Sequence, residues 1–329
     1  MKLDLESGLT NNAVAIGSTR RILVTPPPMV ASKELFLQKA KVLNLELDFL
    51  SSAQAVKIGE LENIIHKYDG WIIGDDPCPG YLLKNARNGK LKAVVKWGIG
   101  MDNIDLEAAT ELGVAVTNTP LMLGKEVADL ALTYMNMLAR QVLNFHLSVV
   151  AGDWKKPIGV SLKDKKVGIV GFGDIGKNLQ KRCQAAEMEV IIYEVNDLQK
   201  VGFTNLEYLK WPFGINTLDF LVFACPLTES TRHMFNMEVA RMINRQLFLI
   251  NMSRGEIVAE EVLVEGLSKG FLRGVALDVF EHEPLPLTSR LRQFENVIFG
   301  THNASNTSEA VSRVSFHALE KMNVLLESN

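Results

Sequence analysis

The chain has 329 residues, of which 47% are hydrophobic and 22% are charged, and its formal net charge is −3. This length favours two domains, and the composition is that of a globular protein with an ordinary core. The weakly acidic balance argues against nucleic acid or an anionic membrane surface as a partner. The three cysteines form no CxxC pair and their number is odd, so the sequence predicts no disulfide framework and a reducing, cytoplasmic location.

Residues 1–18 are polar and weakly patterned. They lack the apolar segment of a signal peptide and are predicted to form a tail or a loosely docked arm. No apolar run in the sequence approaches the roughly 20 residues that a membrane helix needs.

The first part of the chain alternates short apolar runs, rich in strand-forming residues, with segments of helical periodicity. The runs cover residues 21–25, 45–50, 71–75, 93–98 and 114–118. Such alternation predicts parallel βαβ units and a sheet that helices cover on both faces.

Residues 124–150 read as one long helix whose apolar residues are too dense for a lone surface helix. Two interpretations remain open: a helix that links two domains, or a helix that also contributes to a subunit interface. The Gly- and Pro-containing segment that follows, residues 152–165, is predicted to be an exposed loop.

A second βα series begins at Lys166, and the spacing of its apolar runs predicts a six-stranded doubly wound sheet. These runs cover residues 167–171, 190–194, 218–225, 247–251, 274–280 and 296–302.

A glycine-rich turn directly follows the first run of this series. In GFGDIG, residues 171–176, Gly171 allows a tight turn, Gly173 lets the backbone approach a pyrophosphate, and Gly176 lets the following helix pack on the strand. Glu194 ends the next predicted strand, where its carboxylate can accept hydrogen bonds from ribose hydroxyls and repel a 2′-phosphate. This context favours NAD over NADP, against the alternatives of a glycine turn that binds nothing and a solvated glutamate.

A second glycine pair, Gly98-Ile99-Gly100, follows the buried run at 93–98 but lacks the third glycine of the motif. Ligands of open α/β sheets bind outside the carboxyl ends of strands, so the backbone N–H groups at 98–100 are candidates for holding a substrate carboxylate. The alternative is an ordinary tight turn.

Three ionisable residues, Arg254, Glu283 and His302, lie at or just past the ends of successive predicted strands. Reduction of a 2-oxo acid needs a proton donor at the carbonyl oxygen and a cation for the carboxylate. His302 is the predicted acid/base because an imidazole titrates near neutral pH, Glu283 is its orienting partner, and Arg254 is the substrate clamp. Each has a structural alternative when taken alone; their joint placement favours catalysis.

Other chemistries find no support in the sequence. The histidines and cysteines show no ligand spacing such as HExxH, so no metal is predicted, and no GxSxG sequence indicates a serine nucleophile.

Seven segments together resemble the D-isomer-specific 2-hydroxyacid dehydrogenases, a family that includes phosphoglycerate, glyoxylate/hydroxypyruvate and D-lactate dehydrogenases. The segments are KWGIGMDNID (96–105), TNTP (117–120), GFGDIGK (171–177), FACPLTEST (223–231), NMSRGEIV (251–258), ALDVFEHEP (276–284) and GTHNAS (300–305). The resemblance covers roughly residues 20–325, and the order of the SRG, DVFxxEP and histidine elements is highly specific.

The resemblance implies two doubly wound parallel-sheet domains. A discontinuous flavodoxin-like substrate domain would comprise residues 1–119 and 304–329, and a Rossmann NAD domain residues 120–303. It also implies a homodimer with the 124–150 helix in the interface. The activity would be the NAD-dependent interconversion of a small D-2-hydroxy acid and its 2-oxo acid, with 3-phosphoglycerate, hydroxypyruvate, glyoxylate and a sugar-derived acid all open.

The same resemblance assigns residue roles. It places the catalytic groups on Arg254, Glu283 and His302, brings Arg254 and His302 beside the cofactor, and lets Ile99 touch both cofactor and substrate. Further NAD contacts are implied at Asp174, Ile175, Glu194, Cys225, Met252 and Asp278. Lys96 and Trp97 stand where the family often has Arg-x-Gly, so they are expected to shape the substrate site.

Two further interpretations share this fold. A non-catalytic NAD(H)-sensing scaffold, like the corepressor members of the family, would keep the cofactor site and act by binding partners. A formate dehydrogenase is disfavoured, because members of that type carry Gln where this chain has Glu283.

Overall fold

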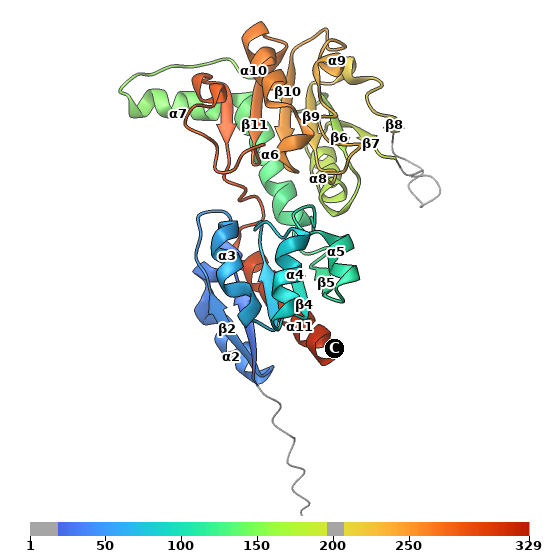
Figure 1. The fold of residues 1–329 in the computed structure, drawn as a ribbon. Helices are drawn as coiled ribbons and strands as arrows, with labels where there is room; N and C mark the ends of the chain where they lie inside the picture. Colours follow the sequence, from blue (N-terminus) through green and yellow to red (C-terminus); the bar gives the residue numbers. More distant parts are fainter. Residues whose placement is uncertain (1–18, 196–206, 329) are drawn as a thin grey trace, which may run out of the picture.

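The computed structural model describes residues 19–195 and 207–328, so the predicted tail at 1–18 lies outside the described residues. Two parallel sheets form two lobes that lie end to end (Figure 1). We refer to the lobe around the five-stranded sheet as the small half and to the lobe around the seven-stranded sheet as the large half. The predicted fold class is confirmed.

The sheet of the small half has the order β2-β1-β3-β4-β5, with all neighbours parallel. Its strands are β1 (Arg20–Val24), β2 (Leu45–Phe49), β3 (Gly70–Ile73), β4 (Ala93–Lys96) and β5 (Ala115–Asn118). All five predicted strands of this half are therefore present.

Alternate residues of these strands enter two different cores, as the two-residue period of a strand requires. Ile22 and Val24 pack toward α11 (Ser308–Glu327), whereas Leu23 and Trp71 pack toward the opposite face. The helices on the α11 side are α1 (Pro27–Ala31), η1 (Lys33–Leu35) and α2 (Leu37–Val42); on the other side lie α3 (Ile58–Ile64), η2 (Ile65–Lys67), α4 (Gly80–Asn88) and α5 (Leu106–Glu111).

The sheet of the large half is parallel and has seven strands in the order β12-β11-β10-β9-β6-β7-β8. They are β6 (Lys166–Val170), β7 (Glu189–Tyr193), β8 (Glu207–Leu209), β9 (Phe220–Phe223), β10 (Leu247–Asn251), β11 (Leu272–Leu277) and β12 (Val297–Phe299). The prediction of six strands was wrong by one, because β8 is a three-residue edge strand without an apolar run.

Helices cover both faces of this sheet. α6 (Gly124–Arg140) and α8 (Asp174–Ala185) pack on one face. The other face carries α9 (Met237–Ala240) and α10 (Glu260–Lys269), with the short helices η3 (Ile215–Thr217), η4 (Gly255–Ile257) and η5 (Arg290–Gln293) in the connections.

The predicted single helix at 124–150 is wrong in one respect. Gln141 adopts a left-handed conformation, with φ 54° and ψ 41°, and divides the segment into α6 and α7 (Val142–Val150). α6 is buried against the large sheet, whereas α7 projects from that half with the irregular segment that follows it (Figure 1).

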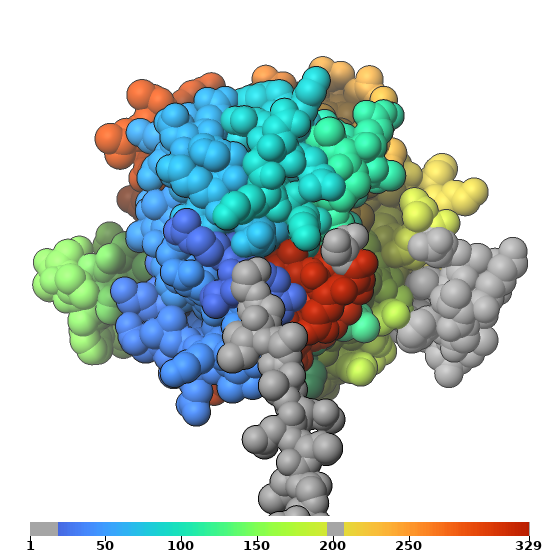
Figure 2. All heavy atoms as spheres, turned by 60° about the horizontal axis from the view of Figure 1, so that its bottom comes forward, coloured from blue at the N-terminus to red at the C-terminus, as the bar shows by residue number. Residues whose placement is uncertain are grey.

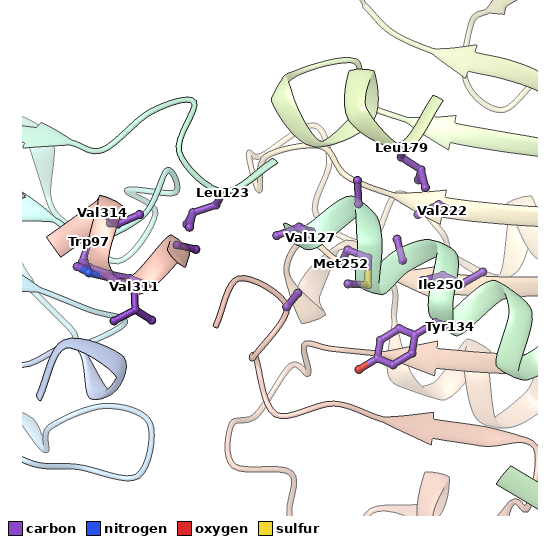
Figure 3. Packing of buried hydrophobic residues seen from close by; sticks show 14 of the residues in the cluster. Trp97, Leu123, Val127, Tyr134, Leu179, Val222, Ile250, Met252, Val311 and Val314 are labelled. Atoms are coloured by element: carbon purple, nitrogen blue, oxygen red, sulfur yellow. The ribbon is translucent and has the colours of Figure 1, made fainter. Parts of the chain in front are cut away.

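The last helix, α11, returns to the small half. Figure 2 shows it in red, bordered by the blue and cyan segments of the first hundred residues. The Trp97 indole donates a hydrogen bond to Ser315 Oγ at 2.9 Å, and Val311 and Val314 lie beside it in the apolar cluster of Figure 3. The same cluster continues through Leu123 and α6 into the large half. In residues 19–195 and 207–328, no helix is long and apolar enough to cross a membrane.

Candidate active site

The glycine turn after β6 has the backbone geometry that the sequence predicts. Gly171 has φ 96°, a conformation that strongly favours glycine. A Cβ on Gly176 would collide with the Gly171 carbonyl oxygen, whereas a Cβ on Gly173 would meet open space. The turn is therefore tight, α8 sits close to the strand, and the backbone at Gly173 is accessible to a bulky anion at the helix N-terminus.

Glu194 is turned toward this glycine turn. Its Oε2 accepts a hydrogen bond from the Phe172 N–H at 2.9 Å, and its Oε1 accepts one from the Val195 N–H at 2.9 Å. The carboxylate is thus held at the end of β7, beside the expected pyrophosphate position, which suits a ribose contact.

Asp174, at the start of α8, is engaged in a structural contact. Its carboxylate accepts hydrogen bonds from the Gly124 N–H at 3.0 Å and from Asn178 Nδ2 at 3.0 Å. A Cβ on Gly124 would collide with this carboxylate, so the glycine is what lets α6 begin so close to α8. The side chain therefore ties α6 to α8, and the helix N–H groups of Asp174 and Ile175 are the atoms suited to an anion.

His302 and Glu283 meet as predicted. The imidazole Nδ1 lies 2.8 Å from Glu283 Oε2, and Glu283 Oε1 accepts the Phe280 N–H at 2.9 Å. Because Nδ1 faces a carboxylate, this contact favours a proton on Nδ1 and leaves Nε2 as the other nitrogen of the ring. Burial lowers the pKa of His302, but the hydrogen bond to Glu283 and the nearby charges of Asp75 and Glu283 outweigh it and raise the pKa above its ordinary value.

The conformation of His302 is fixed by its own loop. The residue has φ 54°, and its N–H donates to the Asp278 carbonyl at 2.6 Å. The buried Asp278 carboxylate accepts the N–H groups of Asn303 and Ala304 at 3.1 and 2.9 Å. Burial raises the pKa of Asp278 despite those two hydrogen bonds. Asp278 therefore fixes the backbone of residues 302–304 and, through it, the position of the imidazole.

Arg254 is oriented by the small half. Its Nε donates to Asp102 Oδ2 at 3.1 Å and its Nη1 to the Ser253 carbonyl at 3.0 Å. A Cβ on Gly100 would collide with Nη2, so the guanidinium lies directly against the backbone of the 98–100 turn. Burial lowers the pKa of Arg254, but the charges of Asp102 and Asp75 outweigh burial and raise the pKa above its ordinary value. This side chain is therefore a permanent cation.

The 98–100 turn has the features expected of a carboxylate-binding loop. Gly98 has φ 124° and is locked to Thr119 by its N–H, which donates to Oγ1 at 2.8 Å. Among the described residues, the N–H groups of Ile99 and Gly100 donate no hydrogen bond. These donors adjoin Arg254, so the turn and the guanidinium can share one anion.

Two predicted substrate contacts, Lys96 and Trp97, have other partners. The Lys96 side chain is 2% exposed, and its ammonium donates to the Gly74 carbonyl at 2.5 Å, to Asp75 Oδ1 at 2.8 Å and to Asn103 Oδ1 at 3.2 Å. Trp97 is buried against α11. Lys96 therefore contacts Asp75, and it acts on the site through that carboxylate.

The sequence analysis missed three side chains of the small half that the structure brings to this site. Gln54 Nε2 lies 3.0 Å from Glu283 Oε2 and 3.2 Å from Asp75 Oδ2, and Asp102 holds Arg254. Asp75 and Asp102 follow strands β3 and β4, so their position at strand ends was an available signal. Nothing near Gln54 in the sequence singles it out.

Two other predicted cofactor contacts, Cys225 and Met252, are buried at the ends of β9 and β10, and Ser253 Oγ donates to the Cys225 carbonyl. In the part of the chain that the structure describes, no group of three or more His, Cys, Asp or Glu side chains is arranged to hold a metal ion.

Comparison with known proteins decides the family. Residues 132–304, more than half of the chain, match the model for the D-isomer specific 2-hydroxyacid dehydrogenase, NAD binding domain. The chain belongs to this family. It is therefore an NAD-dependent oxidoreductase of 2-hydroxy acids, which confirms the predicted class of enzyme and the predicted cofactor.

Relatives and solved structures agree. The chain is 34% identical to a glyoxylate reductase of Thermococcus litoralis over 80% of this chain and 82% of that protein. It is 35% identical to a hydroxypyruvate reductase of Thermotoga maritima over 73% and 79% of the two chains. The crystal structure of the TT0316 protein from Thermus thermophilus superimposes with a TM-score of 0.83, at 29% identity, over 94% and 97% of the two chains.

The role of Glu194 can be tested by cofactor preference. Glu194→Ala is expected to lower the ratio of kcat/KM for NADH to that for NADPH by about tenfold or more, because a like charge no longer faces the 2′-phosphate. Glu189→Ala, which removes an exposed carboxylate from the same strand, is the control. An unchanged ratio in Glu194→Ala would remove this residue from the ribose contact.

Proposed function

We propose that this dehydrogenase reduces a small 2-oxo acid with His302 as proton donor, Glu283 as the partner of its imidazole and Arg254 as the clamp for the substrate carboxylate. The observation that carries the proposal is the 2.8 Å pair of His302 and Glu283, which lies near enough to Arg254 for the charge of the guanidinium to act on the imidazole. The N–H groups of Ile99 and Gly100 would bind the same carboxylate.

The proposed roles follow from where charge develops. Bound NADH supplies the hydride that adds to the carbonyl carbon. The His302 Nε2–H bond then breaks as the new O–H bond forms, and Glu283 stabilises the imidazolium before the transfer. Arg254 pairs with the carboxylate and polarises the adjacent carbonyl, which lowers the cost of the negative charge on oxygen.

The residues at the ends of β6 and β7 have the groups that NAD needs. The open backbone at Gly173, the first N–H groups of α8 and the carboxylate of Glu194 suit a pyrophosphate and a ribose. We propose that cofactor contacts come from the predicted residues at this face, namely Gly171, Gly173, Asp174, Ile175, Gly176, Glu194, Cys225, Met252, Arg254, Asp278 and His302.

We further propose that the substrate is an unphosphorylated acid of the glyoxylate and hydroxypyruvate type. Two observations support this choice. Relatives that match over more than two thirds of both chains are named glyoxylate and hydroxypyruvate reductases, whereas two phosphoglycerate dehydrogenases match over only 38% and 43% of their own length. In addition, the Lys96 ammonium is paired with Asp75, and Arg254 is the proposed clamp for the carboxylate, so neither of these two cations is left for a phosphate group.

A panel of 2-oxo acids, followed by the absorbance of NADH, tests both proposals. We expect turnover of glyoxylate and hydroxypyruvate, with kcat/KM at least about tenfold above that of phosphohydroxypyruvate. A preference for the phosphorylated acid would overturn the substrate class. Tight NADH binding without turnover of any acid would overturn catalysis and favour a scaffold that senses NAD(H).

We propose a homodimer in which α7 and the following segment lie in the interface. Apolar side chains gather there: Phe145, Leu147, Val149, Val150, Trp154 and Ile158 are exposed, with Trp154 77% and Ile158 89% accessible. Such a patch marks a contact surface. Sedimentation of wild type and Trp154→Glu tests this, since a dimer that persists in the variant would count against the interface.

We also propose the domain boundaries of the sequence analysis and a cytoplasmic location. Residues 1–119 and 304–329 would form the substrate domain and residues 120–303 the NAD domain, which is supported by the packing of α11 on β3 and β4. The three buried, free cysteines, Cys78, Cys183 and Cys225, support a reducing compartment.

A further inference from the structure

A second carboxylate faces the imidazole from the opposite half of the molecule. Asp75, which follows β3, places Oδ2 3.6 Å from His302 Nδ1. The predicted partner, Glu283, comes from the large half and lies at 2.8 Å. His302 is thus contacted by one carboxylate from each half, and neither the sequence motifs nor the proposed function gives Asp75 a role.

Asp75 is ionised in this position. Burial raises its pKa, but the charges of Lys96, His302 and Arg254 and the hydrogen bond from Lys96 outweigh burial and hold the pKa well below its usual range. The Lys96 ammonium donates to Asp75 Oδ1, the carboxylate oxygen other than the one near His302. The ammonium also donates to the Gly74 carbonyl and to Asn103 Oδ1, and these bonds fix its position. The carboxylate therefore keeps one oxygen on a buried ammonium and directs the other at the imidazole.

Gln54 explains how two carboxylates can lie on one side of the ring. Its Nε2 lies 3.0 Å from Oε2 of Glu283, 3.2 Å from Oδ2 of Asp75 and 3.2 Å from His302 Nδ1, so its two N–H groups can donate to the two carboxylates. The nitrogen must face them, because the amide oxygen would place a third acceptor among two others. The amide thereby bridges the two carboxylates while the Nδ1 proton goes to Glu283.

The other charges around His302 do not replace Asp75. Arg254, after β10, opposes protonation of the ring, and Asp278, after β11, directs its carboxylate at the N–H groups of Asn303 and Ala304. Glu283 and Asp75 are the two carboxylates within salt-bridge distance of the ring among the described residues. If Asp75 is removed, Glu283 alone offsets both burial and Arg254.

We propose that Asp75 is a positioning residue that, held by Lys96 and bridged by Gln54, keeps His302 in its protonated form for the reduction. The proposal rests on the proposed function, since it assumes that His302 donates the proton. It gives the small half a part in the proton transfer, beyond its part in binding the substrate carboxylate. Opposite charges at this distance favour the charged form of a group, so the protonated ring persists to higher pH when Asp75 is present.

The test is the pH dependence of Asp75→Asn, which keeps the size of the side chain and removes its charge. Reduction needs the protonated ring and is lost as the pH rises through the pKa of His302. We therefore expect the basic limb of the kcat/KM profile for glyoxylate to move down by about one pH unit. Oxidation of glycolate needs the neutral ring, so its acidic limb should move down as well. A smaller plateau rate with unshifted limbs in both directions would overturn the proposal.

Controls separate this role from a loss of structure. Asp75→Glu restores the charge and should move the limbs back toward wild type, and Glu62→Gln, which removes an exposed carboxylate from α3, should leave them in place. In case Asp75→Asn fails to fold with an unpaired Lys96, the double variant Asp75→Asn/Lys96→Met removes both charges. It should show a downward shift that is smaller than that of Asp75→Asn, because loss of the ammonium favours protonation of the ring.

A readout without turnover completes the design. The ring-proton NMR resonance of His302, identified by its absence in His302→Ala, should titrate at lower pH in Asp75→Asn than in wild type. If it titrates unchanged, Asp75 does not act on the imidazole. If instead His302→Ala keeps its turnover, the proposed function fails, and the two failures are thus distinguishable.

Discussion

Replacing His302 by alanine is expected to lower kcat for the reduction of a 2-oxo acid by about 10²–10⁴-fold, which is the range for loss of a positioned general acid. The reason is local: the ring held by Glu283 at 2.8 Å is the proposed source of the proton for the carbonyl oxygen. The affinity for NADH should remain close to wild type, because the glycine turn and Glu194 are untouched. Steady-state rates and a fluorescence titration with NADH measure the two quantities separately.

The chain offers a matched control next to the catalytic pair. His282 is exposed and adjoins Glu283, so His282→Ala removes an imidazole from the same loop without touching the proposed proton path. It should keep nearly wild-type kcat. If His302→Ala and the control His282→Ala both keep nearly wild-type kcat, His302 is not the proton donor.

Replacing Arg254 by alanine should lower kcat/KM by about 10²–10³-fold, since truncating one partner of a hydrogen-bonded charge pair, here the proposed pair with the substrate carboxylate, costs about 2–5 kcal/mol. Both kcat and KM should change, because the guanidinium binds the substrate carboxylate in the ground state and stabilises charge in the transition state. Arg254→Lys keeps the charge without the planar fork and should recover only part of the loss. Steady-state kinetics with glyoxylate at saturating NADH measures the effect.

Gly100→Ala tests the same clamp without removing it. Its methyl group would displace the guanidinium from the 98–100 turn, so KM should rise while the charge of Arg254 is retained. The surface variant Arg241→Ala, at the end of α9, serves as control and should behave as wild type. An unchanged kcat/KM in Arg254→Ala would show that another group binds the carboxylate.

The strands were predictable because a buried parallel strand needs a continuous apolar run, as in the LFLIN run at 247–251 that forms β10. β8 was missed because three residues, EYL, carry no such run. The break at Gln141 was missed because the residue is neither glycine nor proline, and its left-handed conformation shows no sequence signal of the usual kind.

The site was predictable only where local sequence determines it. The glycine turn and the residues after β10, β11 and β12 lie next to recognisable strands. Gln54, Asp75 and Asp102 depend on how the two halves meet, since each of them contacts a residue more than 150 positions away in the sequence. Their role follows from tertiary packing, which composition and periodicity do not encode.

The position of α11 has a consequence for biosynthesis. Its buried residues Val314, Leu319 and Met322 complete the core around β1, β3 and β4, and Met322 Sδ lies against Gly70. A ribosome makes those strands, which end by Lys96, well before it makes the helix that covers them, which begins at Ser308. Until then, α1 and α2 are the helices of the small half that cover this face of its sheet. The core of the small half is therefore complete only once residues 308–327 have been synthesised.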